Sequence, residues 1–159
     1  MKTTVIEPHK SSLGMDANIA SILVFAAMAI VSWLGFLAWF AWAVPLVFFY
    51  LEKESAFVKF QAMQALVIGI ASAVINIIFR IFIRMLTPRD IYSALNYAMG
   101  RGWGAWRLLG TLSSIVGIAF LALEIFIIYS SYNWKQVEIP VVADFAAKAR
   151  AILDSSGKG

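Results

Sequence analysis

The sequence contains no cysteine and a single histidine, His9, among its 159 residues. Without cysteine the chain can form no disulfide, no thiolate metal site and no thiol nucleophile. One histidine cannot supply the cluster of imidazole ligands that a zinc or haem site needs within one chain. We therefore expect the protein to work without a metal ion or a cofactor.

Charged residues are also scarce. They make up 14% of the chain, whereas 62% of its residues are hydrophobic and the mean hydropathy is +0.82. Soluble domains are about half apolar, so this composition is typical of a membrane protein with the lipid bilayer as its partner. In such a chain the formal net charge of +4 faces anionic headgroups. The pattern of basic residues interleaved with aromatics that marks a nucleic-acid-binding surface is absent, so we expect no nucleic-acid partner.

The residue patterns of common catalytic sites are missing too. The chain has no Ser–His–Asp set, no pair of catalytic carboxylates and no glycine-rich loop placed to bind phosphate. An enzyme acting on lipid would have Glu124 as its only general base, with no partner group. We therefore expect no enzymatic activity.

What the sequence does contain is long runs without charge. No charged residue occurs from Ala17 to Leu51, a run of 35 positions. One helix of that length would extend about 52 Å, well beyond a hydrocarbon core of about 30 Å. The segment Ser32-Trp33-Leu34-Gly35 offers a break, which predicts a tight helical hairpin with legs slightly short of a full span. Pro45 is expected to kink the second leg. The alternative is one tilted span followed by a segment in the membrane plane.

Two longer apolar runs follow this hairpin. Phe60 to Phe79 is 20 uncharged residues, which matches one crossing, and Leu108 to Tyr129 is interrupted only by Glu124. Both carry small residues suited to close helix packing, namely Gly69, Ala71, Ser72 and Ala73 in the first and Gly110, Ser113, Ser114 and Gly117 in the second. The predicted fold is an all-α integral membrane protein. Its four-helix transmembrane bundle combines the short N-terminal hairpin with two longer spans.

The flanking segments are polar or amphipathic. We expect residues 1–16 to form a solvated leader, residues 17–134 the transmembrane domain and residues 135–159 an amphipathic segment with a tail. Apolar residues recur at helical spacing in two segments, which predicts amphipathic helices. The first is expected to lie at the membrane surface, and the second either at the membrane surface or against the bundle. The first contains Ile91, Leu95, Ala98 and Met99; the second contains Val142, Phe145, Ala146, Ala149, Ile152 and Leu153.

Four crossings place both termini on one side of the membrane. That side then holds eight basic residues against five on the other, so the positive-inside rule favours cytoplasmic termini. With three crossings the counts would be seven and six, which favours neither orientation. The expected location is a bacterial inner membrane or an intracellular membrane.

Ionisable side chains within or beside the spans are candidate sites, because charge is costly in lipid. Glu124 is the one acidic residue inside a crossing. It either accepts hydrogen bonds from Gln61 or Gln64, or it lies near the interface and reaches water. Arg80 and Arg84, spaced i, i+4 on one face, either bind a lipid phosphate or a partner's acidic group, or anchor the helix by reaching the headgroups.

The uncharged polar side chains have a structural interpretation. Gln61 and Gln64 are one helical turn apart and are favoured as hydrogen-bonding links between helices rather than as a substrate site. Asn76 lies near the middle of its span and is expected to bond to a neighbouring helix.

Two motifs carry a resemblance to a known family. The first is Phe57-Val58-Lys59-Phe60-Gln61-Ala62-Met63-Gln64-Ala65-Leu66, and the second is the Ile139-Pro140 step with the amphipathic segment after it. They resemble small polytopic membrane proteins that include the twenty-kilodalton Tic component of the chloroplast import machinery and magnetosome proteins of the MamF type. Gln61 stands where the family pattern has histidine. The resemblance implies four crossings, no enzymatic activity, and Phe57, Lys59 and Pro140 as motif positions.

The expected function is that of a non-catalytic membrane component. It would act as a scaffold, an accessory subunit or part of a protein-translocation complex, through contacts with other membrane proteins or with itself. The alternative is a small oligomeric channel or transporter, with Glu124, Gln64 and Asn76 lining a polar path.

Overall fold

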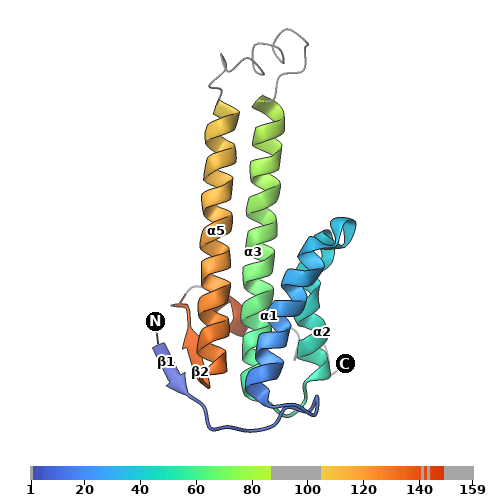
Figure 1. The fold of residues 1–159 in the computed structure, drawn as a ribbon, viewed down its shortest axis with the longest axis vertical. Coiled ribbons are helices and arrows are strands. Elements are labelled where there is room, and N and C mark those ends of the chain that lie inside the picture. The colour runs from blue at the N-terminus through green and yellow to red at the C-terminus, as the bar shows by residue number, and fades with distance from the viewer. Residues whose placement is uncertain (1, 87–104, 141, 143, 149–159) are drawn as a thin grey trace. The chain divides into compact units, whose positions relative to one another are not determined.

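The computed structural model describes residues 2–86, 105–140, 142 and 144–148 of the chain (Figure 1). The fold divides into two compact units, one of residues 1–71 with 122–159 and one of residues 72–121. The elements are mostly helical, as predicted, and the two longest helices, α3 and α5, contribute residues to both units. The helix predicted at residues 91–99 lies outside the described residues.

The first unit contains the predicted hairpin. Helix α1 spans Ala17–Trp33, a 3₁₀ helix (η1) spans Gly35–Ala43, and α2 spans Val44–Leu51. Helix α1 ends at Leu34, and Gly35 follows with a φ of +58°, a conformation that favours glycine. Because α1 packs against both η1 and α2, the chain reverses direction at the predicted break.

The returning leg of the hairpin differs from the prediction in two ways. Its first nine residues form η1, a 3₁₀ helix that the apolar pattern did not indicate. Pro45 lies in the first turn of α2, where a backbone N–H would have no partner within the helix. The predicted kink at Pro45 is therefore wrong, because this proline starts a helix. At standard rises, α1 is about 25 Å long and the returning leg roughly 30 Å.

The two long helices are long and apolar enough to cross a membrane. Helix α3 spans Ala56–Leu86 and α5 spans Ala105–Tyr132. Their apolar segments have mean hydropathies of 2.4 and 2.3. Large side chains of α5 such as Leu108, Ile115 and Ile118 are more than half exposed. Apolar surface of this extent is unfavourable in water and is satisfied by lipid.

A two-stranded sheet joins the segment before α1 to the segment after α5. Strand β1 (Lys2–Val5) pairs antiparallel with β2 (Lys135–Glu138), with Lys2 opposite Glu138 and Val5 opposite Lys135 (Figure 1). The leader is exposed along β1, and its backbone pairs with β2. The pairing places the chain before α1 directly beside the chain after α5, so both leave the helical region at the same end of the first unit.

One hydrophobic cluster of the first unit includes residues that flank this sheet. The buried residues Ala17, Ala20, Phe57 and Val58 form the cluster, and Ile6, Leu13, Met15 and Trp134 pack against it. The leader and the turn after α5 therefore contribute apolar side chains as well as backbone bonds. Their burial favours a leader that folds onto the helices.

The segment after β2 is helical where it is described, at residues 140, 142 and 144–148. Pro140 starts this helical stretch, a position that proline tolerates. Ala146 is buried, whereas Phe145, predicted on the same apolar face, is exposed. The remainder of the predicted helix lies outside the described residues.

The small residues of α3 and α5 differ in what they contact. An added side-chain carbon on Gly69 would lie 3.1 Å from Met28 Sδ on α1 and 3.3 Å from Trp42 Cα on η1. Gly69 therefore lets α3 approach the hairpin closely, as predicted. Gly110 and Gly117 of α5 have open space beside them instead.

Candidate functional site

The most densely hydrogen-bonded group in the described part of the chain is the carboxylate of Glu52. Glu52 lies between α2 and α3, and its side chain is only 1% exposed. Its Oε1 accepts hydrogen bonds from the backbone N–H groups of Ser12 (3.1 Å), Glu54 (3.0 Å) and Ser55 (2.9 Å). The hydroxyl of Ser12 also donates to Oε1 at 2.9 Å, and the hydroxyl of Ser11 donates to Oε2. One buried charge therefore joins the leader to the hinge between α2 and α3.

These bonds stabilise the ionised form of Glu52. Burial acts to raise its pKa, but the hydrogen bonds from Ser11, Ser55 and Ser12 outweigh burial and lower the pKa from 4.5 to about 2. Glu52 is thus a fixed negative charge at neutral pH. A carboxylate with this many donors holds structure in place and is a poor proton acceptor, so it is unsuited to general acid–base chemistry.

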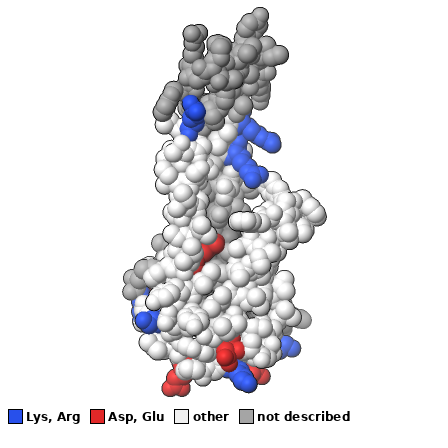
Figure 2. Space-filling model, in the orientation of Figure 1, with Lys and Arg blue, Asp and Glu red and all other residues white. Residues whose placement is uncertain are grey.

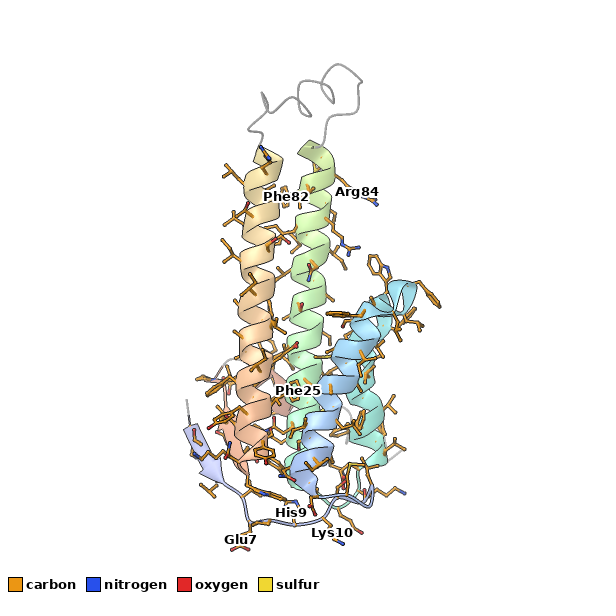
Figure 3. All side chains as sticks on the ribbon, viewed as in Figure 1. Glu7, His9, Lys10, Phe25, Phe82 and Arg84 are labelled. Atoms are coloured by element: carbon orange, nitrogen blue, oxygen red, sulfur yellow. The ribbon has the colours of Figure 1, made fainter. Side chains whose placement is uncertain are left out.

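Ser55 and His9 form a second link between the leader and the hinge. His9 Nε2 lies 2.7 Å from Ser55 Oγ, and His9 Nδ1 lies 2.8 Å from the carbonyl oxygen of Glu7. Figure 3 shows Glu7, His9 and Lys10 along the loop that leads from β1 to α1. Ser55 Oγ also accepts the N–H of Val58 at 3.2 Å, which makes it the N-cap of α3.

A serine bonded to a histidine has the residue types of a nucleophile and its base. Here Ser55 is 1% exposed and its Oγ is committed to the N–H of Val58. The second nitrogen of His9 contacts a backbone carbonyl rather than a carboxylate. The arrangement therefore caps a helix and fixes the leader, and it offers a substrate no access.

Glu52, Ser55, His9, Ser11 and Ser12 form a polar end of the first unit, and Trp134 lies beside them. Its ring stacks on Phe57 with a centroid distance of 6.4 Å and lies 5.8 Å from the ring of His9. Its backbone oxygen accepts the N–H of Ile6 at 2.8 Å, and its φ is +56°. A bulky residue in this conformation is strained, so the packing on Phe57 must outweigh the cost.

The residues of the predicted motif start α3 within this cluster. Phe57 is buried against Trp134. Lys59 extends over the ring of Phe49, with Nζ 5.9 Å from its centroid, and donates to the carbonyl oxygen of Lys53 at 3.4 Å. The motif residues thus have structural roles at the start of a long helix.

The two glutamines are fully buried and have different surroundings. Gln64 Nε2 donates to the carbonyl oxygen of Val137 in β2 at 2.9 Å, so it links α3 to the sheet as a structural bridge. Gln61 has no hydrogen-bond partner for either amide atom among the described residues. Neither glutamine bonds to Glu124. One interpretation of Glu124 from the sequence was that it accepts a hydrogen bond from Gln61 or Gln64, and the structure does not contain this bond.

The polar residues further along the long helices differ in their bonds and in their exposure. Asn76 Nδ2 donates to Ser72 O at 2.9 Å, one turn back on its own helix, rather than to a neighbouring helix as expected. Arg80 and Arg84 are exposed near the C-terminal end of α3. Glu124 is half-buried on α5, and no hydrogen bond or ion pair to another described residue is found for it. Asn76, Arg80 and Arg84 belong to the second unit, whereas Glu124 belongs to the first.

Sequence reasoning missed the residues at the centre of the polar end, above all Glu52, Ser55, His9 and Trp134. The one available signal was the charged hinge Glu52-Lys53-Glu54, which Ser55 follows directly in the sequence. Within the described ranges, no three His, Asp or Glu side chains are grouped so as to hold a metal ion.

The chain is similar in sequence to membrane proteins of Methanocaldococcus jannaschii. The UPF0132 membrane protein MJ1443 is 28% identical over 137 residues, which cover 86% of this chain and 91% of the relative. The UPF0132 membrane protein MJ1527 is 26% identical over 137 residues, which cover 86% of this chain and 72% of the relative. No protein-family model and no solved structure matches the chain.

These similarities extend over most of the chain and include both long helices. The resemblance to the Tic component and to MamF-type proteins is not confirmed by them and stays a prediction. Together with two exposed apolar helices of sufficient length, the similarities identify the chain as a small helical membrane protein that resides in a lipid bilayer.

Proposed function

We propose that the protein is a non-catalytic component of a membrane assembly, acting as a scaffold or an accessory subunit. A role in a protein-translocation complex is the form that the Tic-like resemblance favours. The observation that carries this proposal is a face of α5 inside a membrane span. Its small residues have open space beside them, and its carboxylate has no bond to a described residue.

The small residues of this face leave room for a neighbouring helix. Gly110 and Gly117 are two helical turns apart and therefore lie on one side of α5, with Ser114 between them. An added side-chain carbon at either glycine would meet no atom within 4 Å. Gly110-xxx-Ser114 and Ser113-xxx-Gly117 both have the small-xxx-small spacing that lets membrane helices approach closely.

Glu124 gives a second reason for assembly. It follows Gly117 by seven residues on α5, and its half-buried carboxylate has no bond to a described residue. A carboxylate in a membrane span is costly unless a donor meets it. A donor from another membrane protein or from a second copy would satisfy it.

The proposed topology is a four-helix transmembrane bundle with both termini on the cytoplasmic side. The β1–β2 pairing supports termini on one side, because it holds residues 2–5 against residues 135–138. The cysteine-free chain allows a direct test with single cysteines and an impermeant label. Lys10→Cys and Lys135→Cys should label from the cytoplasmic side, and Ser93→Cys from the opposite side. Labelling of residues 10 and 135 from opposite sides would contradict this topology.

The channel alternative has less support, since two of the three side chains that it needs are engaged. Gln64 is bonded to Val137, and Asn76 is bonded within its own helix. Catalysis is also not proposed, because the one serine–histidine pair found is a buried helix cap.

The assembly proposal predicts that bulk on the small-residue face of α5 weakens association. Gly117→Ile should reduce resonance energy transfer between donor- and acceptor-labelled chains in liposomes, or co-purification of native partners, at least severalfold. The physical reason is that the added side chain holds a neighbouring helix away from the backbone. Ala119→Ile is the matched control, because residue 119 is also exposed and points to another side of α5.

Equal effects of the two substitutions would contradict a role for this face. A wild-type chain that stays monomeric in liposomes and retains no protein from its native membrane would contradict the assembly proposal itself.

A further inference from the structure

The net charge of the protein is confined to its second unit. Residues 1–71 and 122–159 contain eight basic and eight acidic residues, which cancel. Residues 72–121 contain five arginines and one acidic residue, Asp90, and they carry the whole formal charge of +4. All the basic residues of this unit are arginine, whereas the first unit has seven lysines and one arginine.

The described arginines of this unit lie where the spans leave the hydrocarbon. Arg80 is the first residue after the uncharged run from Phe60 to Phe79, which is about 30 Å long as a helix. Arg84 is one turn, or about 6 Å, further along α3. Arg107 is the third residue of α5. Long basic side chains at this depth place their charged ends at the level of the lipid phosphates.

The three side chains are exposed to the surroundings of the protein. Arg80, Arg84 and Arg107 are all in the exposed class, and Arg80 and Arg84 share a face of α3. Figure 3 shows Arg84 extending away from α5. On the face drawn in Figure 2, basic atoms of this unit lie at the surface of the molecule.

We propose that Arg80, Arg84 and Arg107 form a binding surface for the phosphodiester headgroups of anionic phospholipids. The unit carries a formal charge of +4, which favours negative charge in its surroundings. A guanidinium binds phosphate oxygens in pairs and stays charged at the membrane surface, properties that lysine lacks in part. Lipid is the source that the depth of Arg80 favours, because a soluble anion would have to enter the edge of the bilayer.

The test measures which lipid the protein retains. The chain is purified from mixed micelles of phosphatidylglycerol and phosphatidylcholine, and the bound lipids are counted by native mass spectrometry. The wild-type protein should retain phosphatidylglycerol preferentially. The ratio of anionic to zwitterionic lipid should fall about fivefold for each of the three arginines replaced by glutamine. Arg→Lys at the same three positions should keep part of the preference, since the charge remains.

The matched control is Lys59→Gln, which removes one positive charge at the other end of the uncharged run of α3. It should leave the ratio within about twofold of the wild-type value, because Lys59 belongs to the first unit, whose basic and acidic residues cancel. Circular dichroism of every variant establishes that the helices are retained. The single variant Arg84→Gln keeps the test decisive if the triple variant does not fold.

A second measurement distinguishes lipid from free phosphate. Short-chain phosphatidylglycerol should raise the unfolding temperature of the micellar protein, and soluble glycerol phosphate at the same concentration should not. Equal stabilisation by the soluble anion would overturn the assignment to lipid. A wild-type protein without lipid preference, or an unchanged preference in the arginine variants, would overturn the site. Neither result bears on association through α5, so failure of this inference is distinct from failure of the proposed function.

Discussion

Replacement of Glu52 by alanine is expected to lower the free energy of unfolding by about 3–5 kcal/mol. The substitution removes the acceptor for five hydrogen bonds, and the buried N–H of Ser55 is left without its partner. It also releases the leader, because Ser11 and Ser12 are attached to the hinge through this carboxylate. The measurements are thermal unfolding in detergent and hydrogen exchange of the leader amides, which should become faster.

Glu54→Ala is the control for this prediction. Glu54 carries the same charge two residues away, but its side chain is exposed. Exposed substitutions without special contacts change stability by about 0.5 kcal/mol or less. If the two variants unfolded at the same temperature, the buried carboxylate would not be the link that the structure indicates.

The same group makes stability depend on acidity. The pKa of Glu52 is lowered from 4.5 to about 2 in the folded chain, so between these values the unfolded state binds more protons. The stabilisation is therefore fully present above about pH 4.5 and is lost as the pH falls towards 2. A shift of this size corresponds to about 3 kcal/mol. In the Glu52→Ala variant the free energy of unfolding should fall less steeply with decreasing pH in this window. If the variant and the wild-type chain showed the same pH dependence, the low pKa of Glu52 would be contradicted.

The apolar helices could be predicted from the sequence, because the length of an uncharged run can be read directly along the chain. The length of an uncharged run, compared with the thickness of a bilayer, predicts the break near Gly35 and the two long helices. The helices are longer than the uncharged runs, since α3 starts at Ala56 and ends at Leu86. Helical backbone continues into the headgroup layer, where charged side chains such as Lys59 and Arg84 are tolerated.

The polar end of the first unit could not be predicted, because its contacts join segments far apart in the chain. Strand β1 pairs with residues 135–138, and nothing in four polar residues near the start specifies that partner. The hinge has two glutamates, Glu52 and Glu54, of which one is buried and one exposed. Only the folded leader decides between them, since Ser11 and Ser12 supply the donors that make burial of Glu52 favourable.

Side-chain details within the spans were predictable in kind but not in partner. Gln64 bridges elements as expected, but its partner is a strand rather than a helix. Asn76 donates a hydrogen bond to a backbone carbonyl of its own helix, as short polar side chains in helices can do. The small residues of α3 and α5 look alike in sequence, yet Gly69 is in close contact and Gly117 is not. Only the positions of the neighbouring elements distinguish a packed glycine from an open one.

This contrast gives the second large prediction, that Gly69→Val separates α3 from the hairpin. A side chain at residue 69 would meet the backbone of Trp42, 3.3 Å from the first added carbon, and a backbone atom cannot move aside as Met28 Sδ can. Overpacking of this kind costs about 1–3 kcal/mol, and more where backbone must shift. We expect a marked fall in the unfolding temperature. The fluorescence of a variant with Trp42 as its only tryptophan should also change as η1 moves.

Gly117→Val and Gly69→Ala are the two controls for this prediction. Gly117→Val adds the same side chain to a membrane span where no atom lies within 4 Å, so in the monomer it should leave the unfolding temperature nearly unchanged or raise it slightly, because glycine is a poor helix former. Gly69→Ala adds only the first carbon, which Met28 can accommodate in part, and its effect should lie between those of the two valine variants. If the valine variants at residues 69 and 117 behaved alike, α3 would not approach η1 through Gly69. The hairpin would then be held to α3 by the packing of Ala17 and Ala20 against Phe57 and Val58, and by Glu52 and the leader.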